Sequence, residues 1–212
     1  MSGYLTVNGE KEREEIIERS KFICKLCHVE SEEEAKQFIE KVKKEHSLAT
    51  HNCYAYIADD KGLVQKFSDD GEPQGTAGLP MLNALKMSGL KKVVAVVTRY
   101  FGGIKLGTGG LARAYGGAVS ECIKVAEIIN MQKVAYFEII SDYDLYSKLI
   151  NMISRLNIPV VSTDFANDVR VKLAVKLDDE NSEEQFLAKI YDLYKGKDVI
   201  SEKSYGYYPF KV

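Results

Sequence analysis

Apolar and polar positions in the first 130 residues follow two spacings, the alternation typical of strands and the three-to-four-residue repeat typical of helices. Ser31 and Glu34 form a capping box, which opens a helix that carries Ala35, Phe38 and Ile39 at helical spacing. The other elements follow from β-branched runs or helical repeats: strands or hairpins over 13–29, 51–67 and 92–98, and helices over 80–88 and 111–129.

The chain after Gln132 has a different pattern, in which strands and helices alternate. The predicted elements are strands over 134–140, 158–165, 169–177 and 199–207, with one helix capped by Ser141 and another by Ser182. Their order, β-α-β-β-α-β, is typical of a ferredoxin-like domain. We therefore expect an α+β protein of two domains, 1–130 and 131–212.

Glycine and positive charge gather in one stretch of the chain. Eleven of the 16 glycines lie between Gly71 and Gly117, and residues 84–125 carry seven Lys and Arg side chains against Glu121 alone. Clustered glycine indicates a backbone that adopts positive φ or lies close to another group. The net charge of −2 argues against a protein that is basic throughout, but this stretch predicts a local basic face.

The segment from Arg99 to Gly110 connects a predicted strand to a predicted helix, a junction at which backbone N–H groups bind anions. Gly102 and Gly107 have the spacing of a P-loop, but Thr108 stands where that motif requires Lys. A dinucleotide fingerprint also fails, because no acidic residue ends a second strand about 20 residues later. A general anion or RNA site remains, with these candidate residues: Arg99, Tyr100, Gly102, Gly103, Lys105, Gly107, Gly109, Gly110, Arg113 and Gly117.

An acidic loop lies earlier in the chain. Asp69, Asp70 and Glu72 are suited to bind Mg²⁺ or to do acid–base work. The same carboxylates are equally suited to cap turns or to pair with Arg99 or Arg113, and both interpretations stay open here. The predicted accessory cleft consists of His51, Asp69, Asp70, Glu72 and Thr76.

The cysteines suggest no metal or haem site. Cys24-Lys-Leu-Cys27-His28 matches the attachment string of c-type haem, but that attachment requires export, and the first 20 residues carry no secretory signal. Cys53 and Cys122 do not have the spacing of zinc ligands. No run of 18 apolar residues exists. We expect a cytoplasmic protein with reduced thiols, without cofactor, metal or membrane contact.

Three segments in this order resemble the YigZ/IMPACT family over about residues 18–125: Ala-Thr-His-Asn-Cys-Tyr-Ala-Tyr from Ala49, Asp-Asp-Gly-Glu-Pro-Gln-Gly-Thr-Ala-Gly-Leu-Pro from Asp69, and Thr-Arg-Tyr-Phe-Gly-Gly-Ile-Lys-Leu-Gly-Thr-Gly-Gly-Leu from Thr98. The resemblance implies an N-terminal domain with the fold of the second domain of a small-subunit ribosomal protein, followed by a ferredoxin-like domain. It also implies that the pair is similar to the last two domains of elongation factor G.

The function implied by the resemblance is a role in translation. Eukaryotic members of the family regulate translation initiation through a further partner-binding domain, which this sequence does not begin with. The resemblance supplies no catalytic residues, so we favour a non-enzymatic regulator that binds RNA or the ribosome through a basic face. This face consists of Arg99, Lys105, Arg113 and Lys124, and the expected stacking partners of unpaired bases are Tyr54, Tyr100 and Tyr115. Binding or conversion of an anionic metabolite and docking of a regulatory protein are the alternatives.

Overall fold

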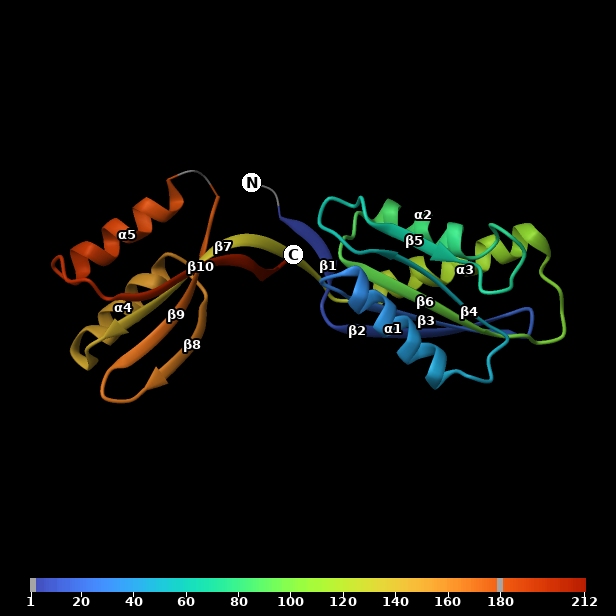
Figure 1. Cartoon of the computed structure of the whole chain (residues 1–212), viewed down its shortest axis with the longest axis horizontal. Helices are drawn as coiled ribbons and strands as arrows, with labels where there is room; N and C mark the ends of the chain where they lie inside the picture. Colours follow the sequence, from blue (N-terminus) through green and yellow to red (C-terminus); the bar gives the residue numbers. More distant parts are fainter. Residues whose placement is uncertain (1–2, 179–180) are drawn as a thin grey trace. The chain divides into compact units, whose positions relative to one another are not determined.

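This computed structural model describes residues 3–178 and 181–212, and its main chain is of the α+β type, with antiparallel sheets and five helices among the described residues (Figure 1). The chain divides into two compact units built on Tyr4–Asn130 and on Met131–Phe210. We call them the first and the second unit and describe each by itself.

A five-stranded sheet forms the centre of the first unit, in the order β2-β3-β6-β4-β5. Its strands are β2 (Glu10–Ile17), β3 (Ser20–His28), β4 (His51–Ile57), β5 (Gln65–Ser68) and β6 (Val93–Tyr100). Every neighbouring pair is antiparallel, so the two hairpins expected from the sequence are confirmed. Strand β6 lies in the middle of this sheet, and seven of its eight residues are buried.

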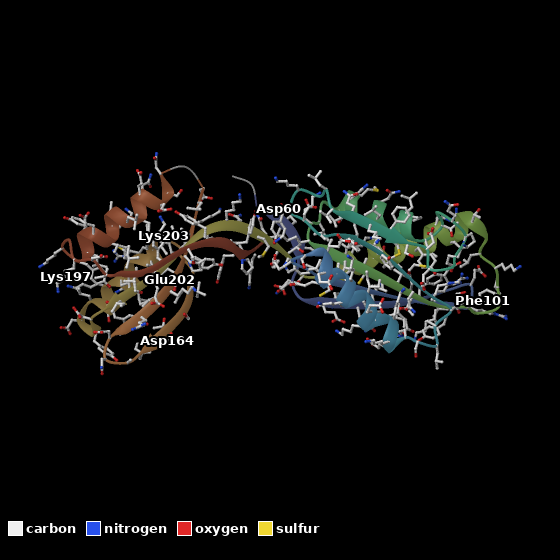
Figure 2. All side chains as sticks on the ribbon, viewed as in Figure 1. Asp60, Phe101, Asp164, Lys197, Glu202 and Lys203 are labelled. Atoms are coloured by element: carbon white, nitrogen blue, oxygen red, sulfur yellow. The ribbon has the colours of Figure 1, made fainter. Side chains whose placement is uncertain are left out.

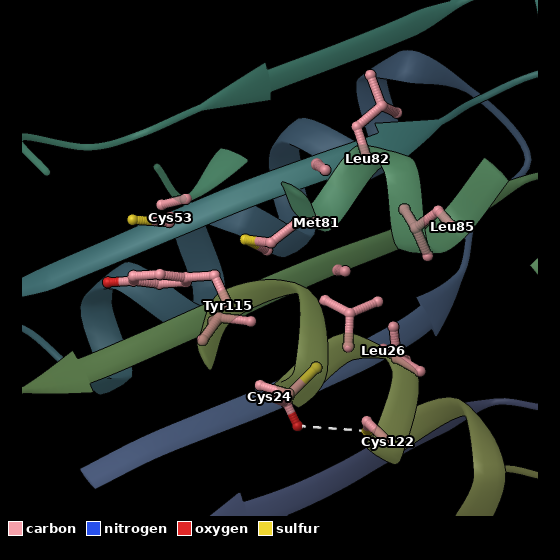
Figure 3. Packing of buried hydrophobic residues seen from close by; sticks show 14 of the residues in the cluster. Cys24, Leu26, Cys53, Met81, Leu82, Leu85, Tyr115 and Cys122 are labelled. Atoms are coloured by element: carbon pink, nitrogen blue, oxygen red, sulfur yellow. Dashed lines mark hydrogen bonds between the residues drawn. The ribbon is translucent and has the colours of Figure 1, made fainter. Parts of the chain in front are cut away.

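Helices cover both faces of this sheet. On one face lies α1 (Glu32–Glu45), whose N-cap Ser31 accepts a hydrogen bond from the Glu34 amide, as the sequence predicts. On the other face, α2 (Gly78–Ser88) and α3 (Gly107–Val125) pack on β3, β4 and β6. Figure 3 shows this layer, in which Met81 and Leu85 of α2 lie with Tyr115 of α3. Cys24 and Cys27 lie on opposite faces of β3, as expected for two strand residues that are three positions apart.

Four sequence-based boundaries are wrong. Helix α3 begins at Gly107 rather than Leu111, and it ends at Val125 because Ala126 is extended and Ile128 already starts β7. The residues expected to cap the helices of the second unit do not do so: Ser141 ends β7, and Ser182 is the first helical residue after the cap Asn181. Strand β1 (Tyr4–Val7) was not predicted, because four residues carry too short an alternation.

The second unit has the order β-α-β-β-α-β along the chain. Its elements are β7 (Ile128–Ser141, which starts within the first unit), α4 (Tyr143–Arg155), β8 (Val160–Phe165), β9 (Val169–Lys176), α5 (Ser182–Leu193) and β10 (Ile200–Lys211). The strands lie in the order β10-β7-β9-β8. Phe137 and Leu173 face Leu149 of α4 and Phe186 of α5, so both helices cover one face. In the part of the chain that the structure describes, no helix has the length and apolar character needed to cross a membrane.

Candidate functional site

The loop between β6 and α3 is fixed by its first glycine. A Cβ on Gly102 would lie 1.9 Å from the carbonyl oxygen of Arg19, so only glycine fits against the β2–β3 turn. The Gly102 amide donates to Ser20 Oγ at 3.2 Å. The loop ends at Leu106, the N-cap of α3, which gives no side-chain cap to the helix. The first N–H groups of α3 therefore have no side-chain partner.

Exposed cations and exposed glycine backbone surround this helix end. Lys105 and Arg113 are exposed, as are Gly107 and Gly109, and the first turn of α3 contains no acidic residue. Phe101 is 47% exposed. We call this surface the cationic face: Phe101, Lys105, Gly107, Gly109 and Arg113. Figure 2 shows Phe101 at one end of the first unit and Asp60 at the other.

Arg99 is not part of that exposed face. Its guanidinium donates to Glu72 Oε1 at 2.6 Å and to Ser20 Oγ at 3.2 Å, and the two ion-paired side chains are only 6% and 4% exposed. The rings of Phe22 and Phe101 lie 5.4 and 5.3 Å from the guanidinium carbon. The sequence suggested Arg99 or Arg113 as the partner of the acidic loop. Arg99 is the one that forms the ion pair, and its partner is Glu72.

Tyr115 belongs to the same buried cluster. It has no exposed surface, and its hydroxyl donates to Glu72 Oε1 at 2.8 Å. Burial raises its pKa above the ordinary range of tyrosine. The expectation that Tyr115 stacks on RNA bases is therefore wrong, because its ring is a core element on the stripe of α3. Tyr100 is half-buried, and its hydroxyl lies 3.0 Å from His46 Nδ1.

Both aspartates of the acidic loop accept hydrogen bonds from backbone amides. Asp69 accepts hydrogen bonds from the amides of Gly75, Ala77 and Gly78 at 2.8–3.0 Å, so it holds the loop against the start of α2. Asp70 accepts from the amide of Asn52 at 2.7 Å. These are the turn-forming roles that the sequence left open beside metal or acid–base chemistry.

Two further residues complete this loop. Asp70 also lies 3.3 Å from Lys43 Nζ, which supplies a counter-charge. The buried Thr76 hydroxyl donates to the carbonyl oxygen of Pro73 at 2.6 Å. Within the described chain, no group of three or more His, Cys, Asp and Glu side chains has an arrangement that could hold a metal ion.

His51 is held in one tautomer by the acidic loop. Its Nδ1 lies 2.8 Å from the carbonyl oxygen of Asp70, and a carbonyl oxygen only accepts, so Nδ1 carries the proton. In the neutral ring Nε2 is then an acceptor. This Nε2 lies 3.8 Å from Glu72 Oε1.

A cavity of about 440 Å³ joins part of the predicted site to part of the predicted accessory cleft. Five predicted residues line it: His51, Glu72, Arg99, Lys105 and Gly107. The other predicted residues do not line it: Asp69, Asp70, Thr76, Tyr100, Gly102, Gly103, Gly109, Gly110, Arg113 and Gly117. The sequence interpretation missed Phe101, Leu106, Thr108 and Leu111, which also line the cavity. All four lie in the glycine-rich segment, and this position is the feature of the sequence that could have indicated them.

The model of the Impact N-terminal domain matches residues 18–123. A Bacillus subtilis (strain 168) protein named "IMPACT family member YvyE" is 40% identical over 207 residues, which cover 98% of this chain and 94% of that protein. The Escherichia coli (strain K12) "IMPACT family member YigZ" is 36% identical over 184 residues, which cover 86% of this chain and 89% of that protein.

Two further similarities concern a eukaryotic protein and a solved structure. The Homo sapiens "Protein IMPACT" is 36% identical over 94 residues, which cover 42% of this chain and 29% of that protein. A solved structure titled "Crystal structure of an hypothetical protein" matches with a TM-score of 0.63 and 32% identity, and it covers 100% of this chain and 98% of its own. The similarity therefore reaches through both units, whereas the eukaryotic match is confined to part of the chain.

Proposed function

This chain belongs to the IMPACT family, and on that premise we propose that it is a non-enzymatic regulatory protein of translation that binds RNA, alone or in the ribosome, through the cationic face. The role in translation rests on the resemblance to the eukaryotic members. RNA binding rests on the face itself, where cationic side chains and free backbone N–H groups suit contacts with phosphate.

One observation carries the proposal. The acidic side chains of the neighbouring loop bind groups within the protein, whereas the basic side chains of the cationic face are exposed to solvent. Glu72 is paired with Arg99, and Asp69 is bound by three backbone amides. Lys105 and Arg113 remain exposed, and neither forms an ion pair with another described residue. The two exposed cations and the helix dipole therefore both favour an anion at this helix end.

Phe101 offers a surface that can contact a base, which the binding of phosphate alone would not require. Its ring is 47% exposed, and the Arg99 guanidinium lies 5.3 Å from its centroid. An aromatic ring fixed by a cation on one side is suited to stack on an unpaired base with its free surface. Together with Lys105, this favours single-stranded RNA over a duplex.

The finer fold assignments belong to the same proposal. We assign the second unit to the ferredoxin-like class, supported by the strand order β10-β7-β9-β8 with α4 and α5 on one face. We assign the first unit to the fold of the second domain of a small-subunit ribosomal protein. The likeness of the pair to the last two domains of elongation factor G agrees with a role near ribosomal RNA.

The salt dependence of RNA binding tests the proposal. Each phosphate contact with single-stranded RNA contributes a slope of about −0.7 to the plot of log affinity against log salt. The double variant Lys105→Ala with Arg113→Ala should bind a fluorescent oligouridine more weakly, with a slope shallower by about 1.4. Lys61→Ala, next to Asp60 at the other end of the first unit, is the matched control and should bind as the parent does. Equal slopes for the parent and the double variant would contradict the proposal.

The cavity favours a second candidate, the binding of a small anionic metabolite. Its volume of about 440 Å³ lies in the range of small-molecule sites, roughly 300–1,000 Å³. Its lining combines Lys105 with the apolar side chains of Phe101, Leu106 and Leu111. Saturable binding of such a metabolite in calorimetry, lost in Lys105→Ala, is the result that this candidate predicts.

A further inference from the structure

The cavity is lined by a carboxylate whose second oxygen forms no hydrogen bond with the described residues. Glu72 Oε1 accepts from Arg99 and from Tyr115, whereas Oε2 accepts from none of them. The Glu72 side chain is only 4% exposed, and Glu72 lines the cavity. This oxygen is therefore free to accept a hydrogen bond from a group that enters the cavity.

His51 offers a second acceptor in the same cavity. Its Nδ1 proton is used by the carbonyl oxygen of Asp70, which leaves the Nε2 lone pair near Glu72 at 3.8 Å. No described residue lies within hydrogen-bonding distance of this Nε2. Two neighbouring acceptors without protein donors fit a ligand that presents hydroxyl groups side by side.

The other residues that line the cavity are suited to bind an anion. Lys105 brings a positive charge, and Gly107 and Thr108 belong to the first turn of α3, which no side chain caps. The helix dipole and these N–H groups favour an anion at this end of the cavity. Arg99 also lines the cavity, and its buried Nε has no hydrogen-bond partner among the described residues.

The charge state of Glu72 decides what kind of donor fits. Arg99 already neutralises this carboxylate at 2.6 Å, so a ligand ammonium would place a second cation beside one negative charge. A neutral hydroxyl makes the same hydrogen bond without that repulsion. Phe101, Leu106 and Leu111 provide apolar surface for a ring.

We propose that this cavity binds a hydroxylated phosphate monoester the size of a nucleoside 5′-monophosphate. The phosphate lies at Lys105 and the start of α3, and the sugar hydroxyls donate to Glu72 and His51. The proposal rests on the second candidate function above and names its ligand class. A free nucleotide carries both sugar hydroxyls. The 5′-phosphorylated end of an RNA shares the phosphate but keeps only the 2′-hydroxyl, because its 3′-oxygen is esterified.

Calorimetry with a graded set of probes tests the ligand class. Ribose 5-phosphate and uridine 5′-monophosphate each carry the phosphate and the hydroxyls, whereas inorganic phosphate and uridine each lack one part. We expect the two complete probes to bind with dissociation constants at least about tenfold below those of the partial probes. Equal affinities across the set, or no binding of any probe, would overturn the proposal.

Two variants and a control locate the site. His51→Ala should weaken ribose 5-phosphate by about tenfold and leave inorganic phosphate unchanged, while Lys105→Ala should weaken both. His51→Phe, which keeps a ring but has no hydrogen-bond acceptor, replaces His51→Ala if circular dichroism shows that the latter is unfolded. Unchanged affinity for ribose 5-phosphate in the folded His51 variant would overturn the proposal.

Arg113→Ala separates this site from the RNA-binding face. Arg113 does not line the cavity, so its variant should bind ribose 5-phosphate as the parent does while binding oligouridine more weakly. Comparison of oligouridine with and without a 5′-phosphate distinguishes the two sources of the ligand. A preference for the phosphorylated end that disappears in the His51 variant assigns the cavity to RNA ends, and tight binding of the free nucleotide alone assigns it to a metabolite.

Discussion

Arg99 on β6 donates a 2.6 Å hydrogen bond to Glu72 on the loop between β5 and α2, and more than nine-tenths of each side chain is buried. The pair fixes the acidic loop to the central strand of the sheet. It also removes one negative charge from the surroundings of Lys105 and Arg113. A single buried contact therefore contributes both to the fold of the first unit and to the field of the cationic face.

Removal of one partner of this pair should be costly. Glu72→Gln leaves the Arg99 guanidinium buried without its counter-charge, and we expect the free energy of unfolding to fall by about 3–5 kcal/mol. Urea denaturation followed by circular dichroism measures this loss. The double variant Glu72→Gln with Arg99→Met should lose less than the sum of the two single variants, because no unpaired charge remains. A loss below about 1 kcal/mol in Glu72→Gln would show that the pair is not a stabilising element.

Two glycines of the basic stretch should respond to alanine in opposite directions. A Cβ on Gly117 meets no atom within 4 Å, so Gly117→Ala should stabilise the protein by up to about 1 kcal/mol through helix propensity. Gly102→Ala would place its Cβ 1.9 Å from Arg19 O and should destabilise the protein by about 1–3 kcal/mol. Thermal melts of the two variants decide this. A melting temperature of Gly102→Ala at or above that of the parent would contradict the close approach.

Gly116 illustrates how far such a prediction depends on the structure. From the sequence alone, Gly116 lies nearer the apolar stripe of α3, where an added methyl group is expected to overpack the core, and Gly117 lies on the Arg113 face. A Cβ on Gly116 would lie 3.4 Å from the carbonyl oxygen of Pro80, which is an ordinary contact, while Gly117 faces open space. The helical pattern fixes the face of a residue, but not the distance to its neighbour.

Elements that depend on local sequence patterns were predicted correctly, whereas contacts between distant residues were not. Periodicity predicted the hairpins, the first helix and the order of elements in the second unit, because these depend on local alternation. The start of α3 was misplaced, since four glycine-rich residues before Leu111 carry no apolar pattern. The sequence could not tell which carboxylate meets Arg99, because Glu72 and Arg99 are 27 residues apart and only the sheet register brings them together.

The four free cysteines should differ strongly in reactivity. Burial raises the pKa of Cys53 to about 12 and that of Cys24 well above the ordinary value, so both stay protonated and covered near pH 8. Cys122 has a lowered pKa because of the Cys24 thiol beside it, but it is fully buried. Cys27 is only half-buried.

A thiol reagent should therefore modify Cys27 first in the native protein and all four cysteines after unfolding. Burial raises the pKa of Cys27 as well, so its labelling rate should rise as the pH increases toward that pKa. Peptide mass spectrometry after timed labelling identifies the modified residue. Labelling of Cys24 or Cys122 at the rate of Cys27 would contradict the packing of α3 on β3.

Backbone amide shifts of the ¹⁵N-labelled protein show residue by residue whether RNA binds at the cationic face. On titration with single-stranded oligouridine, we expect the largest shifts at residues 101–113, above all at the first amides of α3. The shifts should saturate together and shrink in the variant that lacks Lys105 and Arg113. Saturation of binding without shifts in 101–113, or with shifts confined to Met131–Phe210, would show that RNA does not bind at the cationic face.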